Sequence, residues 1–148
     1  MRFIRSGFHR SIPVIALASV VALTFSQAGC ASAPKQSMES SAANTSGQGT
    51  VEAKAGPNDN TQIEVRVKHL SDPARVASDA SVYVVWIQPR NGEIQNVGAL
   101  RLDDDLVGSL NTTTPHRTFT LTVTPEPSAR MAVPTHRAVF TTEVNRAD

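Results

Sequence analysis

The residues best suited to do chemistry in this 148-residue sequence are its only cysteine, Cys30, and three histidines beyond it, His69, His116 and His136. Zinc sites need three or four cysteine, histidine or carboxylate ligands that converge on the ion. The histidines stand far apart in the sequence, and no two of them have the spacing of a ligand pair. We therefore expect them in solvated loops or at strand ends, and we expect no metal site and no cofactor.

Carboxylates and hydroxyls offer two further chemistries, calcium binding and nucleophilic catalysis. Asp103, Asp104 and Asp105 are consecutive, but the glycine and the later glutamate of a calcium-binding loop are missing around them. We expect a solvated hairpin tip there. Most serines lie before residue 61, and the Gly-x-Ser-x-Gly elbow is not found. The sequence therefore predicts a protein that is not an enzyme and has no small-molecule substrate.

The first 29 residues have the composition of a signal peptide. Arg2, Arg5 and Arg10 give a basic start, and the run from Ile12 to Phe25 is apolar and carries no charge. About 14 residues make a helix of roughly 21 Å at about 1.5 Å per residue. That is shorter than the roughly 30 Å hydrocarbon core of a bilayer. A basic start, a short apolar run and small residues after it are typical of a signal peptide.

The residues around Cys30 suggest what its thiol does. Ala28 and Gly29 directly precede it, and Gln27 stands before them. This resembles the lipobox of bacterial lipoproteins, in which the cysteine sulfur is acylated and the chain is then cut before the cysteine; an aliphatic residue is usual in place of Gln27. The resemblance implies a lipid on Cys30 and a membrane as its partner. The alternative is an ordinary secretory peptide cut near residues 31–33.

Cleavage before Cys30 changes the composition of the remaining chain. Three of the 14 basic residues leave, so 11 basic residues face 13 acidic ones, a net charge of −2. No basic cluster remains, and we expect no nucleic-acid partner. A single cysteine also excludes an intrachain disulfide. Ala31 rather than Asp follows the cysteine, and the lipoprotein resemblance then implies a cell-envelope location, on the periplasmic side of the outer membrane.

The chain after Cys30 divides into a linker and a folded domain. Residues 30–61 are rich in Ala, Ser, Gly and Asn, and their only sizeable apolar side chains are Met38 and Val51. Such a segment buries too little surface to offset its ordering entropy. We expect a disordered, lipid-anchored linker over residues 30–61, with a root-mean-square span of roughly 30 Å, and a β-domain over residues 62–145.

Strands dominate the expected domain, and residues 82–89 are its central one because six consecutive apolar residues open it. Other strands are expected over the ranges 62–70, 94–102, 106–112, 118–124 and 137–144. Arg90-Asn91-Gly92 predicts a type I′ turn. Gly98 predicts a bulge or a close approach over Trp86, and Pro125 is expected to end its strand. Short strands and frequent turns predict a small antiparallel immunoglobulin-like β-sandwich.

Both faces of the central strand are apolar, and one of them must be covered by something other than the main core. The connection 71–81 or the loop 125–136 can provide that cover. Alternatively, Tyr83, Val85 and Ile87 form a partner surface for another copy or an envelope protein.

Four short motifs carry a family resemblance: Tyr83-x-x-Trp86 with Ile87, then residues 96–98, 121–127 and 134–135. Together they resemble the extracytoplasmic domain of anti-sigma-K factor-like proteins, over residues 81–144. The resemblance implies the sandwich fold. A lipoprotein-type signal and spacer precede the domain here, so sigma-factor binding is not expected. We expect a lipid-anchored, non-catalytic binding or structural module; a regulatory or sensory accessory protein is the alternative.

Overall fold

The computed structural model describes residues 33–40 and 47–146, and strands make up nearly all of its regular structure. The strands are β1 (Gln36–Ser40), β2 (Gln48–Ala55), β3 (Thr61–Lys68), β4 (Val82–Pro89), β5 (Gln95–Ala99), β6 (Arg101–Leu102), β7 (Gly108–Thr114), β8 (Thr118–Glu126) and β9 (Phe140–Asn145). Two short helices, η1 (Pro57–Asp59) and α1 (Pro73–Val76), join them. None of the helices in the described ranges has the length and apolar character needed to cross a bilayer.

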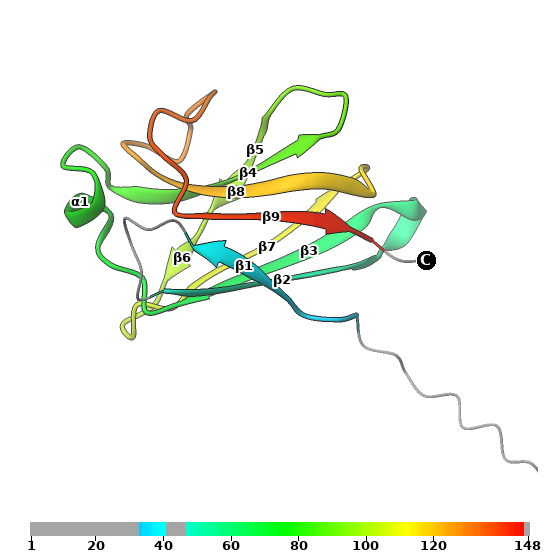
Figure 1. Ribbon diagram of the computed structural model, residues 1–148, viewed down its shortest axis with the longest axis horizontal. Helices are drawn as coiled ribbons and strands as arrows, with labels where there is room; N and C mark the ends of the chain where they lie inside the picture. The colour runs from blue at the N-terminus through cyan, green and yellow to red at the C-terminus, as the bar shows by residue number, and fades with distance from the viewer. Residues whose placement is uncertain (1–32, 41–46, 147–148) are drawn as a thin grey trace, which may run out of the picture. The chain divides into compact units, whose positions relative to one another are not determined.

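The strands form two antiparallel layers (Figure 1). One layer has the order β2-β3-β7-β6, and the other has the order β5-β4-β8-β9. Counted from β2, these strands take positions A, B, E, D and C′, C, F, G of an immunoglobulin-like sandwich. The predicted all-β sandwich is therefore confirmed.

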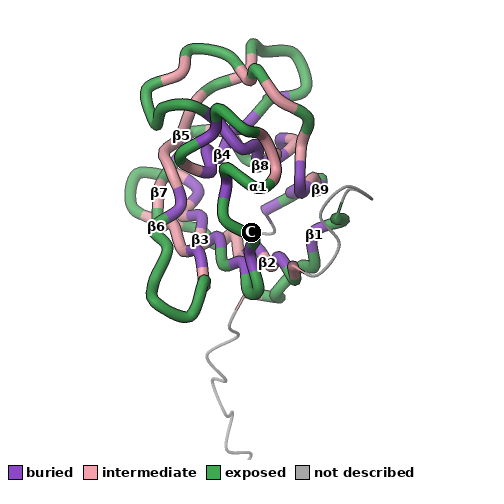
Figure 2. The backbone as a smooth tube through the Cα atoms, turned by 90° about the vertical axis from the view of Figure 1, so that its left-hand side faces the viewer, coloured by how far each residue is buried: buried purple, intermediate pink, exposed green. Residues whose placement is uncertain are grey.

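The core lies between the two layers and follows the period of two expected for strands. Its buried side chains come from alternate positions of the strands: Ile63, Val65 and Val67 from β3, Tyr83, Val85 and Ile87 from β4, and Phe119, Leu121 and Val123 from β8. Figure 2 shows the buried stretches of the strands gathered between the layers.

The expected disordered linker is wrong for much of residues 30–61. β2 pairs with β3 along its whole length, from Gln48↔Lys68 to Ala55↔Thr61. β1 pairs with β2, and Met38 and Val51 are buried at 7% and 2% exposure. Few apolar side chains suffice because the inward positions of β2 are small: Gly49 leaves room for Met38 and for the ring of Phe140. Pairing with a distant strand thus overrides the composition of the segment.

β1 also closes one side of the sandwich. Residues 36–38 pair with β2 in the first layer, whereas Glu39 and Ser40 pair with β9 in the second. The side chain of Gln36 strengthens this link, because its Nε2 donates to Thr142 Oγ1 at 2.9 Å and to the carbonyl oxygen of Glu143 at 2.6 Å. The folded domain therefore begins at β1 rather than at residue 62.

The strand expected over residues 94–102 is in fact two strands in different layers, β5 and β6. Gly98 forms the predicted bulge, since the register shifts opposite Val85 and Trp86. Its φ is +132°, and a Cβ there would lie 3.0 Å from Leu110 Cδ1. The close approach is therefore to Leu110 and not to Trp86.

The turn after β4 differs from the predicted type I′ turn. The N–H of Gly92 donates to the carbonyl of Pro89 at 3.0 Å, but neither Asn91 nor Gly92 has a positive φ. The mirror-image turn needs positive φ at both central positions. The prediction is wrong because the loop runs on to Ile94 before β5 starts, so the turn is not forced to match the strand twist within two residues.

β8 continues past the proline that was expected to end it. The carbonyl of Val123 accepts from the N–H of Val139 at 2.8 Å, on the side of β9. The nitrogen of Pro125 points to the same side, because backbone groups two residues apart in a strand share a direction. The β8–β9 pairing ends at Val123↔Phe140, so the missing N–H interrupts no ladder bond.

Candidate functional site

The residues singled out in the sequence lie in separate parts of the molecule. Cys30 and the predicted signal peptide lie outside the described residues. His69 directly follows β3 and has a φ of +57°, and His116 lies in the turn between β7 and β8. Within the ranges 33–40 and 47–146, no three His, Cys, Asp or Glu side chains cluster as metal ligands would.

The three aspartates form the hairpin tip that the sequence predicts. Asp103, Asp104 and Asp105 are exposed between β6 and β7. The carboxylate of Asp103 accepts from the N–H groups of Asp105 at 3.1 Å and Val107 at 2.9 Å. This carboxylate stabilises the turn.

The candidate partner surface Tyr83, Val85 and Ile87 is wrong. These side chains are 1%, 0% and 0% exposed and belong to the main core. The hydroxyl of Tyr83 reaches past the core and donates to the carbonyl of Ser71 at 2.9 Å. Burial, with a further contribution from the Asp72 carboxylate, raises the pKa of Tyr83 to about 12. This tyrosine therefore fastens the connection between β3 and β4.

The opposite face of β4 carries Val84 and Trp86, and both are fully buried as well. We name residues 127–139, between β8 and β9, the cover segment. Asn96 lies opposite Trp86 in the β4–β5 pairing. Its Nδ2 donates to the carbonyls of Ala129 at 3.0 Å and Met131 at 2.9 Å. The cover segment therefore crosses the Trp86 face, which is one of the two covers that the sequence analysis considered.

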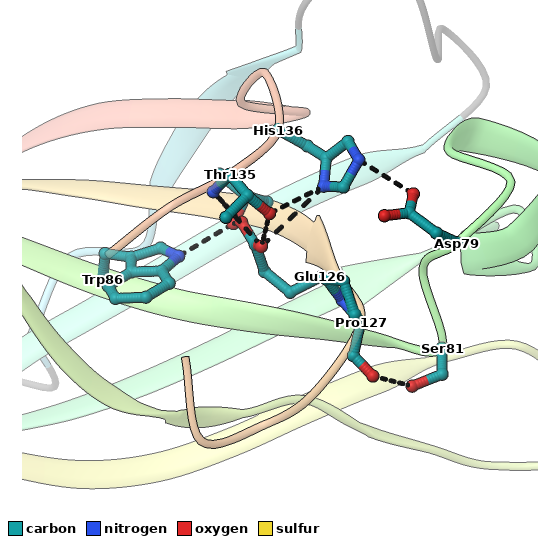
Figure 3. Close-up of polar contacts among 8 residues, drawn as sticks. Asp79, Ser81, Trp86, Glu126, Pro127, Thr135 and His136 are labelled. Carbon is teal, nitrogen blue, oxygen red and sulfur yellow. Dashed lines mark hydrogen bonds and ion pairs between the residues drawn. The ribbon is translucent and has the colours of Figure 1, made fainter. Parts of the chain in front are cut away.

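A buried carboxylate fixes the cover segment. Glu126, at the end of β8, is 0% exposed. Its Oε1 accepts from Thr124 Oγ1 at 2.6 Å and from the N–H of Thr135 at 3.0 Å. Its Oε2 accepts from the hydroxyl and the N–H of Thr135. Trp86 Nε1 donates to the same Thr124 Oγ1 at 2.8 Å. The indole, the hydroxyl and the carboxylate are therefore joined in one continuous series of hydrogen bonds (Figure 3).

His136 extends this series to the β3–β4 connection. Its Nε2 lies 3.0 Å from Asp79 Oδ1, and its Nδ1 lies 3.1 Å from Thr135 Oγ1 and 3.8 Å from Glu126 Oε2. Figure 3 shows the imidazole between the two carboxylates. Nearby, Ser81 Oγ donates to the carbonyl of Pro127 at 2.7 Å. The cover segment is thus held at both of its ends.

The electrostatics of Glu126 suit an ionised, structural carboxylate. Burial alone raises the pKa of a carboxyl group. Here hydrogen bonds from Thr124, Thr135 and the backbone of His136 outweigh burial and hold the pKa of Glu126 below its ordinary value. Thr135, His136 and Asp79 have the residue types of a hydroxyl–imidazole–carboxylate triad, but the Thr135 hydroxyl donates to Glu126. The arrangement locks a loop and does not present an activated hydroxyl.

This network was not predicted from the sequence. The sequence predicted His136 in a solvated loop or at a strand end, and it predicted that the strand ends at Pro125, before Glu126. A usable signal is present, however: Thr124 and Glu126 follow the same outward period as Thr118, Thr120 and Thr122. A carboxylate on that face next to a tryptophan needs either solvent or donors, and the threonines of β8 and the cover segment provide the donors.

A second polar cluster joins the layers at the other end of the sandwich. Arg117 Nη2 and Arg146 Nη2 each lie 2.8 Å from Asp59 Oδ1. Arg146 Nη1 also donates to the carbonyls of Asp59 at 2.9 Å and Asn60 at 3.1 Å. Hydrogen bonds from Arg146 and then Arg117 hold the pKa of Asp59 below its ordinary value. The cluster connects the β2–β3 loop to the start of β8 and the end of β9.

A groove of about 500 Å³ runs over the outer face of β2, β3 and β7. Glu52 and Glu64 lie directly opposite each other there, a pairing that like charges oppose. Lys35 Nζ lies 3.1 Å from Glu52, and Arg66 Nη2 lies 3.7 Å from Glu64. Each carboxylate therefore has a cationic neighbour within the chain.

Comparisons with known proteins identify no relative. No family model, no curated protein and no solved structure matches the chain. The resemblance to anti-sigma-K factor-like proteins therefore stays a prediction.

Proposed function

We propose that this chain is a lipid-anchored protein of the cell envelope whose β-sandwich acts as a non-catalytic binding or structural module. One observation carries the proposal: the only cysteine stands at the end of a signal-like apolar run, six residues before β1 begins. A lipid on that cysteine would hold a folded domain close to a membrane.

The polar side chains of the sandwich are consistent with a module that holds its shape. Both oxygens of the buried Glu126 carboxylate accept hydrogen bonds, which come from Thr124 and Thr135. The exposed carboxylate Asp59 binds two arginines. These contacts stabilise loops at the two ends of the sandwich. We propose that these loops contact other envelope components and that no reacting group is involved.

Metabolic labelling tests the anchor. Cells that produce the wild type or the Cys30→Ala variant are fed radiolabelled palmitate, and the membranes are separated by density. We expect label on the wild type only, and we expect the wild type in the outer-membrane fraction. Equal labelling of the two proteins would overturn the lipid anchor, and recovery in the inner-membrane fraction would overturn the proposed location.

A further inference from the structure

We propose that one particular end of the sandwich faces the bilayer. This inference rests on the lipid anchor proposed above. The two ends are built from different loops. The end that we name the anchor end carries the loops 56–60, 90–94 and 115–117. The end that we name the distal end carries the connection 69–81 with α1, the hairpin tip 103–107 and the cover segment. They lie at the right and left of Figure 1.

The strand registers establish this division. Thr118, the first residue of β8, pairs with Asn145, the last residue of β9. Thr61, the first residue of β3, pairs with Thr114, the last residue of β7. The Asp59 carboxylate then bridges the layers at this end by its contacts with two arginines. The anchor end is therefore a single surface to which both layers contribute.

β1 starts beside the middle of β2 and runs toward the distal end. Gln36 is paired with Val51, in the middle of β2. Lys35 precedes it, and its Nζ contacts Glu52 at 3.1 Å, one residue further toward the anchor end. Because β1 runs from there toward the cover segment, the chain direction at Lys35 points toward the distal end.

The number of residues between β1 and the cysteine limits the distance between the lipid and the sandwich. Lys35 is five residues from Cys30, and an extended chain spans at most about 3.6 Å per residue, or about 18 Å in total. From Glu52 to Gln48, at the distal end of β2, the strand alone covers about 13 Å at roughly 3.3 Å per residue. The distal loops project beyond Gln48. Bringing them to the bilayer would require the segment to reverse and to extend almost fully, whereas the anchor end needs no reversal.

The distribution of charge favours the same orientation. The distal loops carry five exposed carboxylates, Asp72, Asp79, Asp103, Asp104 and Asp105, against three exposed arginines, Arg75, Arg130 and Arg137, which leaves an excess of two negative charges. At the anchor end, Arg90 and Glu93 share one loop, and Asp59 is bound by arginines. Anionic lipid headgroups repel carboxylates that approach them. The bilayer thus favours the end with balanced charge, and α1, the hairpin tip and the cover segment face away from it, toward other envelope components.

Two single-cysteine variants of the full chain test the orientation. Glu93→Cys places a thiol at the anchor end and Asp104→Cys places one at the distal end; both positions are exposed. Because the Cys30 sulfur carries the lipid, the new thiol is the only one open to a fluorescent label. The labelled proteins are extracted, reconstituted into phosphatidylcholine–phosphatidylglycerol vesicles, and quenched by a lipid with a nitroxide on its headgroup.

We expect the label at residue 93 to be quenched several-fold more strongly than the label at residue 104. Inserting about 20 Gly and Ser residues after Ala33 adds roughly 25 Å of flexible span, and this control should remove most of the difference. The orientation alone would be overturned if the two labels were quenched equally, or in the reverse order, in vesicle-bound protein. It would also be overturned if the insertion left the difference in quenching between the labels unchanged. Failure of the wild type to bind vesicles would instead overturn the lipid anchor, and the orientation with it.

Discussion

The indole of Trp86 and the hydroxyl of Thr124 form the link between the central strand and the buried carboxylate of the sandwich. Trp86 Nε1 donates to Thr124 Oγ1 at 2.8 Å, and the same hydroxyl donates to Glu126 Oε1 at 2.6 Å. Trp86 and Thr124 are 0% and 1% exposed. A buried hydroxyl that both accepts and donates leaves neither of its neighbours without a partner.

The Thr124→Val variant should lose stability because it leaves the Trp86 N–H buried without an acceptor. An unsatisfied buried donor costs about 1–3 kcal/mol. Urea unfolding, followed by the fluorescence of the single tryptophan, measures this loss. Thr122→Val, on the same strand and face, is the matched control and should change stability by less than about 0.5 kcal/mol. Equal effects of the two variants would contradict the role of this hydroxyl.

The Glu126→Gln variant should lower stability at neutral pH, because an amide nitrogen would face the donors of Thr135 and Thr124. Removing charge-assisted bonds from a buried site costs about 2–3 kcal/mol. The exposed Glu143→Gln is the control, and we expect it to change little. Urea unfolding of both variants at pH 7 checks this prediction.

The same variant should alter the pH dependence of stability. The folded pKa of Glu126 lies below its ordinary value of 4.5, so the wild type holds this contribution above pH 4.5 and loses it as the pH falls through the folded pKa. The stability gap between wild type and Glu126→Gln should therefore narrow in acid. A gap that stays constant from pH 7 down to the acid limit of folding would contradict an ionised Glu126.

The sequence predicts correctly the strands whose apolar side chains form a clear pattern. β3 and β8 alternate large apolar residues with polar ones, β4 is recognisable as a continuous apolar run, and the bulge at Gly98 in β5 was expected. The prediction failed for β2, whose inward positions include the small residues Gly49 and Ala53. Such a strand is stabilised by pairing with β3 rather than by its own apolar surface. The composition of a segment gives no information about this pairing.

The candidate site failed for a related reason. An apolar run such as residues 82–87 shows that both faces are covered, but not by what. The identity of the cover depends on contacts over long sequence separations, such as those of Asn96 with Ala129 and Met131. Those contacts assign Tyr83, Val85 and Ile87 to the core and Trp86 to the covered face.

The Val51→Ala variant tests the corrected domain boundary. Val51 is 2% exposed within β2, and removing its two methyl groups should lower the free energy of unfolding by about 2 kcal/mol. Lys54→Ala, at an exposed position of the same strand, is the control and should have little effect. If residues 48–55 were a disordered linker, both variants would unfold at the wild-type urea concentration.

The most direct test of the account is the intact mass of the wild-type protein extracted from membranes. We predict a mass that corresponds to a chain whose first residue is Cys30 with a diacylglyceryl group on that cysteine, and we predict that the Cys30→Ala variant lacks this mass. A wild-type chain cut after residue 30, or a mature chain with an unmodified Cys30, would contradict the lipid anchor on which the proposed function depends.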